Sequence, residues 1–216
     1  MGAIARAAAN NITTSGVFTA DAITNASVTG ITVLANASDG ITLISSQTAS
    51  ASASLSFTSG LDSTYKAYKF VYVNIHPATG GVNFEFNLST DSGSNYNVTK
   101  TTTSFWSYSV EAGNDSGLAY IVAEDLAQST SYQRLFSGLG NANDESGSGS
   151  LTLFNPSSTT YVKHFIATSD FYASNNYQTN QFIAGYGNTT SAINAIQFRM
   201  SSGNLDAGTI YMYGIK

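Results

Sequence analysis

Residues 68–88 read YKFVYVNIHPATGGVNFEFNL, and this stretch decides the fold class. It opens with a nearly continuous run of aromatic and β-branched side chains, which is typical of a central strand. Pro77 and the Gly80-Gly81 pair end that run with residues that favour turns. From Val82 to Leu88 every second residue is apolar, and this alternation predicts a half-buried strand.

The same signals recur on both sides of this stretch. Ala53, Leu55 and Phe57 alternate with serines. Turn-forming clusters separate the later apolar segments, and no segment shows a sustained period of 3.6 residues. We therefore expect an all-β fold of about ten or eleven strands, an antiparallel two-sheet sandwich of the jelly-roll type. The further strands are predicted at 105–110, 118–123, 132–136, 151–154, 161–168, 182–186, 193–200 and 209–215.

The predicted C-terminal hairpin comprises residues 193–200 and 209–215. Period-two alternation places Ile196, Phe198 and Met200 on one face of the first strand, and Ile210 and Met212 on one face of the second. We expect these five side chains to be buried.

The chain falls into two unequal parts. Between residues 10 and 40, single apolar residues are separated by Thr, Ser, Asn and Gly, so this segment has too little apolar surface to form its own core. We predict an N-terminal anchoring arm or short stalk at residues 1–40, with a disordered tail as the alternative. Residues 41–216 are expected to form the sandwich.

Composition excludes several classes of function. The 216 residues carry a net charge of −5 and only 10% are charged, which argues against binding a nucleic acid backbone. The absence of cysteine excludes disulfides and thiolate metal sites, so packing or assembly must supply the stability. No apolar run is long enough for a signal peptide or a membrane span, and we expect no membrane insertion.

Ionisable residues do not form a pattern that indicates chemistry. His76 and His164 are interpreted as core or turn histidines, and Asp91 as the start of an Asx turn rather than a Ca²⁺ ligand. The side chains of Glu124 and Asp125 would diverge on a strand, so this pair gives no support for a glycosidase. We therefore predict no catalytic, cofactor-binding or metal-binding residues and no enzyme activity.

Aromatic residues offer one alternative. The chain has 13 Tyr, 12 Phe and a single Trp, and two segments are candidates for a platform on which sugars stack. These segments are Phe105-Trp106-Ser107-Tyr108 and Phe171-Tyr172 with Asn175-Asn176-Tyr177. Most aromatic side chains are expected to fill the core instead.

Four segments carry a family resemblance. The opening ANNITTSGV (9–17) and the closing TTSAINAIQFRMSSGNLDAGTIYMYG (189–214) resemble the ends of small structural virion proteins of marine tailed bacteriophages, and NIHPAT (74–79) and LFNPSS (153–158) are similar to inner segments of the same proteins. The resemblance implies a component of the virion surface, of the head decoration, knob or tail-fibre type. It carries over no catalytic residue.

These observations lead to one expected function and one alternative. We expect a non-enzymatic homo-oligomer, with a trimer as the favoured state, that decorates or cements a capsid and contacts other virion proteins through its N-terminal arm. The alternative is a tail-fibre or receptor-binding protein that recognises host surface glycans. No cofactor is expected in either case.

Overall fold

The computed structural model describes residues 40–216, which form twelve β-strands and one 3-10 turn. The arm predicted at residues 1–40 lies outside these residues except for Gly40. The all-β prediction is confirmed, with one or two strands more than expected. The strands are β1 (Ile41–Thr48), β2 (Leu55–Phe57), β3 (Ala67–Pro77), β4 (Val82–Ser89), β5 (Lys100–Val110), β6 (Ser116–Tyr120), β7 (Gln133–Leu139), β8 (Gly147–Phe154), β9 (Lys163–Ala173), β10 (Tyr177–Gly187), β11 (Ala195–Met200) and β12 (Leu205–Ile215), and the turn is η1 (Val122–Glu124).

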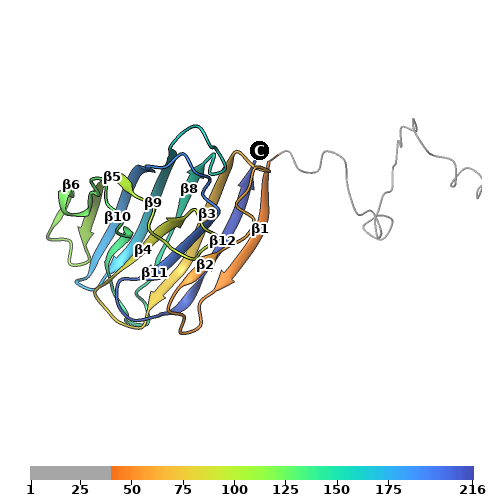
Figure 1. The fold of residues 1–216 in the computed structure, drawn as a ribbon. Coiled ribbons are helices and arrows are strands. Elements are labelled where there is room, and N and C mark those ends of the chain that lie inside the picture. Colours follow the sequence, from red (N-terminus) through yellow and green to blue (C-terminus); the bar gives the residue numbers. More distant parts are fainter. Residues whose placement is uncertain (1–39) are drawn as a thin grey trace, which may run out of the picture. The chain divides into compact units, whose positions relative to one another are not determined.

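All strand pairs are antiparallel, and they form two runs. The long run has the order β1-β12-β3-β8-β9-β10-β5-β6, and the short run has the order β7-β4-β11-β2. A single residue pair, Leu139 with Ala173, joins β7 of the short run to β9 of the long run. The result is a nearly closed, barrel-like sheet, in which Figure 1 shows β4, β11 and β2 lying across the long run.

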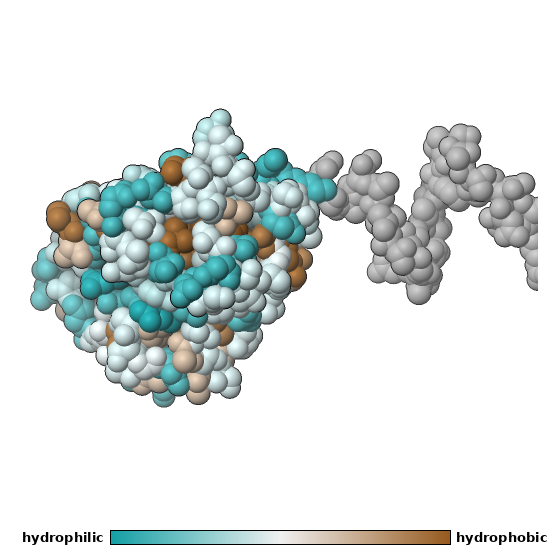
Figure 2. Space-filling model, in the orientation of Figure 1, coloured by the Kyte–Doolittle hydropathy of each residue, from teal (hydrophilic) through white to brown (hydrophobic). Residues whose placement is uncertain are grey.

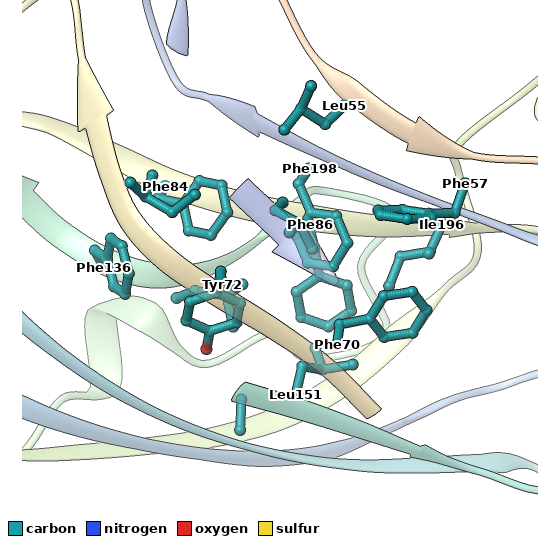
Figure 3. Packing of buried hydrophobic residues seen from close by; sticks show 14 of the residues in the cluster. Leu55, Phe57, Phe70, Tyr72, Phe84, Phe86, Phe136, Leu151, Ile196 and Phe198 are labelled. Carbon is teal, nitrogen blue, oxygen red and sulfur yellow. The ribbon is translucent and has the colours of Figure 1, made fainter. Parts of the chain in front are cut away.

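Aromatic side chains fill the space between the two runs. Phe57 of β2 meets Phe70 of β3 with ring centroids 5.5 Å apart, and Phe86 of β4 meets Phe165 of β9 at 5.1 Å. Figure 3 shows Phe57, Phe70 and Phe86 around Phe198, which is fully buried. Edge-to-face and tilted ring pairs of this kind add to the free energy gained from apolar burial.

The run that begins at Tyr68 is a central strand, as predicted. β3 pairs with β12 on one side and with β8 on the other. Its burial nevertheless alternates, because Tyr68, Phe70 and Tyr72 point into the core while Lys69 and Val71 lie on the outer face. A continuous apolar run therefore does not mean burial on both faces here.

The predicted C-terminal hairpin is wrong, although its buried faces are confirmed. β11 pairs with β4 and β2, whereas β12 pairs with β1 and β3, so the two strands belong to different runs. Ile196, Phe198, Met200, Ile210 and Met212 are all buried. Alternation identifies the buried face of a strand but not the neighbour with which the strand pairs.

The strand predicted at residues 118–123 is also partly wrong. β6 ends at Tyr120, and the chain then forms the 3-10 turn η1. This change of direction turns Glu124 inward, where it is 5% exposed.

The surface reflects the low content of charged residues. Figure 2 shows one face on which hydrophilic and intermediate residues alternate with small hydrophobic areas. Among residues 40–216 there is no helix with the length and apolar character needed to cross a membrane.

Candidate functional site

The strands divide the predicted aromatic segments between opposite faces. On β5, Trp106 and Tyr108 point to the inner face, whereas Phe105 points outward and stacks on Phe182 with ring planes 10° apart. Phe171 belongs to the core. Tyr172 lies on the outer side, where its hydroxyl donates to the Glu111 carboxylate at 2.6 Å. That hydrogen bond raises the pKa of Tyr172 to about 12.

The inward-facing aromatic residues meet in one pocket. The register of β5 and β10 places Trp106 opposite Gln181 and Tyr108 opposite Thr179. The rings of Tyr108 and Tyr177 lie 5.2 Å apart and are tilted by 45°. They form a pocket of about 310 Å³, here called the aromatic pocket, whose lining residues are Trp106, Tyr108, Ser137, Ala173, Asn175, Tyr177 and Thr179.

The pocket exists because the short run does not cover the whole long run. β7 meets β9 at the single pair formed by Leu139 and Ala173. On the N-terminal side of that pair, β7 no longer pairs with the long run, so a seam separates it from β5 and β10. Ser137 projects from β7 at one end of this seam and lines the pocket.

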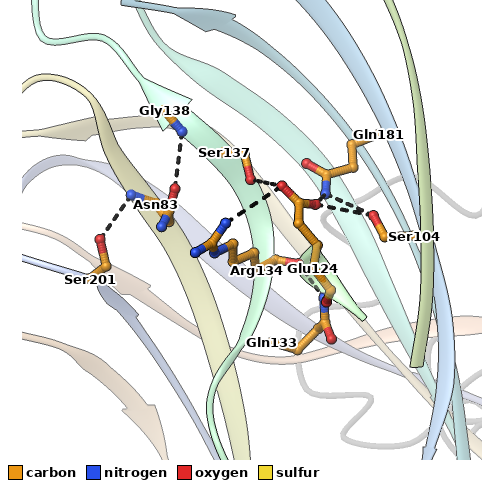
Figure 4. A network of polar contacts seen from close by, with 9 residues as sticks. All are labelled: Asn83, Ser104, Glu124, Gln133, Arg134, Ser137, Gly138, Gln181 and Ser201. Carbon is orange, nitrogen blue, oxygen red and sulfur yellow. Dashed lines mark hydrogen bonds and ion pairs between the residues drawn. The ribbon is translucent and has the colours of Figure 1, made fainter. Parts of the chain in front are cut away.

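A buried carboxylate closes the seam (Figure 4). Glu124 accepts hydrogen bonds from the hydroxyls of Ser137 on β7 and Ser104 on β5, the latter at 3.2 Å, and from the side-chain amide of Gln181 on β10. Arg134 lies 3.8 Å from the same carboxylate. Because buried charges must be paired or hydrogen-bonded, this set of donors explains how a glutamate is tolerated here.

The aromatic pocket and the Glu124 network share one wall. Ser137 both lines the pocket and donates its hydroxyl proton to Glu124. Gln181 lies directly opposite Trp106 in the ladder, and its Oε1 is a buried acceptor without a hydrogen-bond partner. Reversing the amide would turn that oxygen toward the Glu124 carboxylate, so the orientation shown is the favourable one.

A second polar site lies on the outer face of the short run. Arg199, Glu85 and Arg134 are successive register partners across β11, β4 and β7. Nε of Arg199 lies 2.9 Å from Oε1 of Glu85, and its guanidinium covers the Tyr132 ring at 3.7 Å. These groups border a pocket of about 370 Å³. Each arginine has an acidic neighbour, which leaves the pocket polar without a strong net charge.

His76 anchors the end of β3. Its Nδ1 lies 2.7 Å from the Asp206 carboxylate, and its Nε2 lies 3.1 Å from the Ala142 carbonyl oxygen. Burial alone would lower the pKa of His76, but the hydrogen bonds to Asp206 and Ala142 outweigh it and the pKa is raised. Both partners can only accept hydrogen bonds, so the doubly protonated ring, which donates from both nitrogens, satisfies them best.

The other candidate residues have structural surroundings. His164 is exposed on the outer face of β9 beside Tyr186, so its assignment as a core or turn histidine is wrong. Asp91 accepts hydrogen bonds from the Ser89 hydroxyl and from the backbone N–H of Asn95, four residues on, and these lower its pKa to about 2. Within residues 40–216, no three His, Asp or Glu side chains gather as metal ligands would.

Comparisons with protein families, with curated proteins and with solved structures find no match to this chain. The function must therefore be argued from the surfaces and pockets described above. Glu124 is the site residue that sequence reasoning missed. The pair Glu124-Asp125 follows an alternating segment, so it resembles the exposed end of a strand. Its side chain turns inward only because η1 follows β6.

Proposed function

We propose that this chain is a non-enzymatic structural protein of a tailed-phage virion, a homo-oligomeric surface component that decorates or cements the capsid. Its fold is proposed to be a jelly-roll sandwich. The observation that most supports this proposal is an exposed apolar face on the outer side of β9, β10, β5 and β6, which a second copy could cover.

Strand order supports the jelly-roll assignment. An eight-stranded jelly roll places its first, eighth, third and sixth strands in one sheet and its second, seventh, fourth and fifth in the other. When β5, β6, β9 and β10 are set aside as insertions, the remaining orders are β1-β12-β3-β8 and β2-β11-β4-β7. These are the two orders of a jelly roll. The four inserted strands then widen one sheet.

The inserted strands form the apolar outer face. Its members are register neighbours: Ile166 lies opposite Ala184, and Phe182 lies opposite Phe105, which in turn lies opposite Tyr120. Ile166 is 53% exposed and Tyr120 57%. Beside Ile166 the surface sinks into an apolar groove of about 530 Å³ that Phe154, His164 and Tyr186 also line.

A second copy is the partner that this face fits best. Contiguous exposed apolar surface on a soluble protein indicates an interaction site. Each copy carries a net charge of −5, so two copies approach most easily through surfaces without carboxylates. The apolar groove beside Ile166 is lined by no Asp or Glu, and His164 and Tyr186 are its ionisable residues. Two carboxylates lie elsewhere on this face: Asp170 accepts a hydrogen bond from Gln178, and Asp125 accepts one from Tyr120. The low charge of the groove favours close packing between copies.

Light scattering of the purified chain tests the assembly. We expect an oligomer, with a trimer favoured, and we expect the double variant Ile166→Asp/Phe182→Asp to dissociate into folded monomers. Tyr161→Asp places a single aspartate at an exposed position outside these four strands and should leave the oligomer intact. A monomeric wild-type chain would contradict the proposal.

The location on the virion needs a separate experiment. Mass spectrometry of purified particles should find the chain in many copies, and a density map should place it on the capsid surface. The segments at residues 9–17 and 189–214 that resemble virion proteins support this assignment. Absence of the chain from the particles would refute it, and density on the tail would favour the tail-fibre alternative.

A further inference from the structure

We infer that the aromatic pocket binds one sugar ring of a glycan, with Trp106, Tyr108 and Tyr177 as the stacking residues. This site is distinct from the outer face proposed for assembly, because Trp106 and Tyr108 lie on the opposite side of β5 from Phe105.

The aromatic rings of the pocket lie on the inner face of the long run, where an opposing sheet would normally cover them. The long run has eight strands and the short run four, so the inner face of the long run is uncovered near β5. Trp106, Tyr108 and Tyr177 are only partly buried in this uncovered region. Half-buried aromatic rings that converge from two strands offer flat apolar surfaces to a ligand.

Apart from Ala173, the remaining lining side chains are neutral hydrogen-bonding groups. Asn175 contributes an amide, and Thr179 and Ser137 contribute hydroxyls. Because Ser137 donates its proton to Glu124, its oxygen is left as an acceptor toward the pocket. Glu124 thus acts as a positioning residue for Ser137. Polar groups held in place by buried partners are characteristic of specific binding sites.

This combination selects a carbohydrate among the common ligand classes. A pyranose ring has an apolar C–H face that suits aromatic rings and a rim of hydroxyls that suits amide and hydroxyl partners. A phosphate-bearing ligand would need cations, and no Lys or Arg lines the pocket. A volume of about 310 Å³ accommodates a single sugar or the end of a chain, not a long oligosaccharide along its whole length.

The single tryptophan of the chain makes the test specific. Trp106 lies in the pocket, so its fluorescence, excited at wavelengths where tyrosine does not absorb, reports on this site alone. The full chain is titrated with the methyl glycosides of glucose, galactose, mannose and N-acetylglucosamine, and it is applied in parallel to an array of immobilised glycans. We expect a saturable change in Trp106 emission with at least one glycoside or with the free form of a glycan bound on the array.

Variants link the signal to the pocket. Tyr177→Ala should weaken binding at least about tenfold, whereas Tyr177→Phe, which keeps the stacking ring, should stay within about threefold of the wild type. Asn175→Ala changes a turn residue with little risk to folding and should also weaken binding. Phe182→Ala, on the outer face, is the control and should bind as the wild type does.

Two results would overturn the inference. One is a folded wild-type chain that responds to no glycoside and to no glycan on the array. The other is undiminished binding by both Tyr177→Ala and Asn175→Ala. Failure of assembly is distinguishable, because the charged double variant Ile166→Asp/Phe182→Asp is expected to be monomeric and still to bind sugar.

Discussion

At the scale of single residues, Phe198 and Arg199 illustrate how adjacent positions on β11 serve different purposes. Phe198 is fully buried and touches the rings of Phe70, Phe84 and Phe86. Arg199 points to the outer face and pairs with Glu85. The two side chains therefore stabilise the protein through apolar packing and through a partly exposed ion pair, respectively.

We expect Phe198→Ala to lower the free energy of unfolding by about 3–5 kcal/mol, through lost burial and the cavity left behind. Arg199→Ala should cost about 1 kcal/mol, because the Arg199 side chain is 43% exposed and solvent screens the pair. Urea unfolding of both variants measures these values. The reverse order would mean that the strand register is shifted by one residue.

Lys100 gives the protein an unusual dependence on pH. Its side chain is completely buried, and its ammonium group contacts the Asn87 side-chain oxygen and the Val98 carbonyl instead of a carboxylate. Burial lowers the pKa of Lys100 to about 7. The unfolded chain, with a lysine pKa of about 10.5, therefore binds more protons between these values, and stability from this group rises with pH.

Lys100→Met should remove this dependence. We expect the free energy of unfolding of the wild type to rise relative to that of the variant as the pH rises from about 7 to about 10. Relative to the wild type, the methionine variant should be most stable below pH 7. Urea unfolding at several pH values measures the difference. Lys69→Met, at an outer position of β3, controls for the general loss of a lysine charge. Parallel stability curves for wild type and Lys100→Met would contradict the prediction.

At the scale of elements, the Glu124 network joins β7 to β5 and β10, two strands with which β7 shares no backbone ladder. It connects η1 to β5, β7 and β10 across the seam. Glu124→Ala should cost about 3 kcal/mol or more, because it leaves the buried hydroxyl of Ser104 and one hydrogen of the buried Gln181 amide without their acceptor. Hydrogen exchange should then accelerate most for amides of β7 next to the seam. Exchange that rises evenly over the chain would show that the network is not a local connection.

β12 is the element on which the long run depends. It lies between β1 and β3, so deleting residues 201–216 removes the one strand with which β1 pairs and exposes an edge of β3. We expect the truncated chain to aggregate. Soluble protein with a cooperative thermal transition, measured by circular dichroism and light scattering, would show that β12 is dispensable.

At the scale of the whole molecule, assembly should contribute to stability. If copies associate through the apolar outer face, the melting temperature must rise with protein concentration, because association favours the folded state. The double variant Ile166→Asp/Phe182→Asp should melt at a temperature that does not depend on concentration. Differential scanning calorimetry over a hundredfold concentration range, about 1 to 100 µM, measures both. A wild-type melting temperature that stays constant over this range would argue against association.

The aromatic pocket shows how far sequence could predict the site. Trp106, Tyr108, Asn175 and Tyr177 all belong to the segments chosen from the sequence, and the structure brings them together. Phe105 was chosen with them but lies on the opposite face, because alternate residues of a strand point in opposite directions. Glu124 could not be predicted, since its inward position depends on a turn between strands.

Sequence by itself determined the all-β class, most strand positions and the buried face of strands such as β11, because alternation is a local property of the chain. Tertiary structure decided which strands pair. Ile41 pairs with Ile215 and Phe86 with Phe198, and no local pattern specifies partners so distant in sequence. Only those pairings leave eight strands facing four, and that mismatch leaves Trp106 in an open pocket because too few strands remain to cover it.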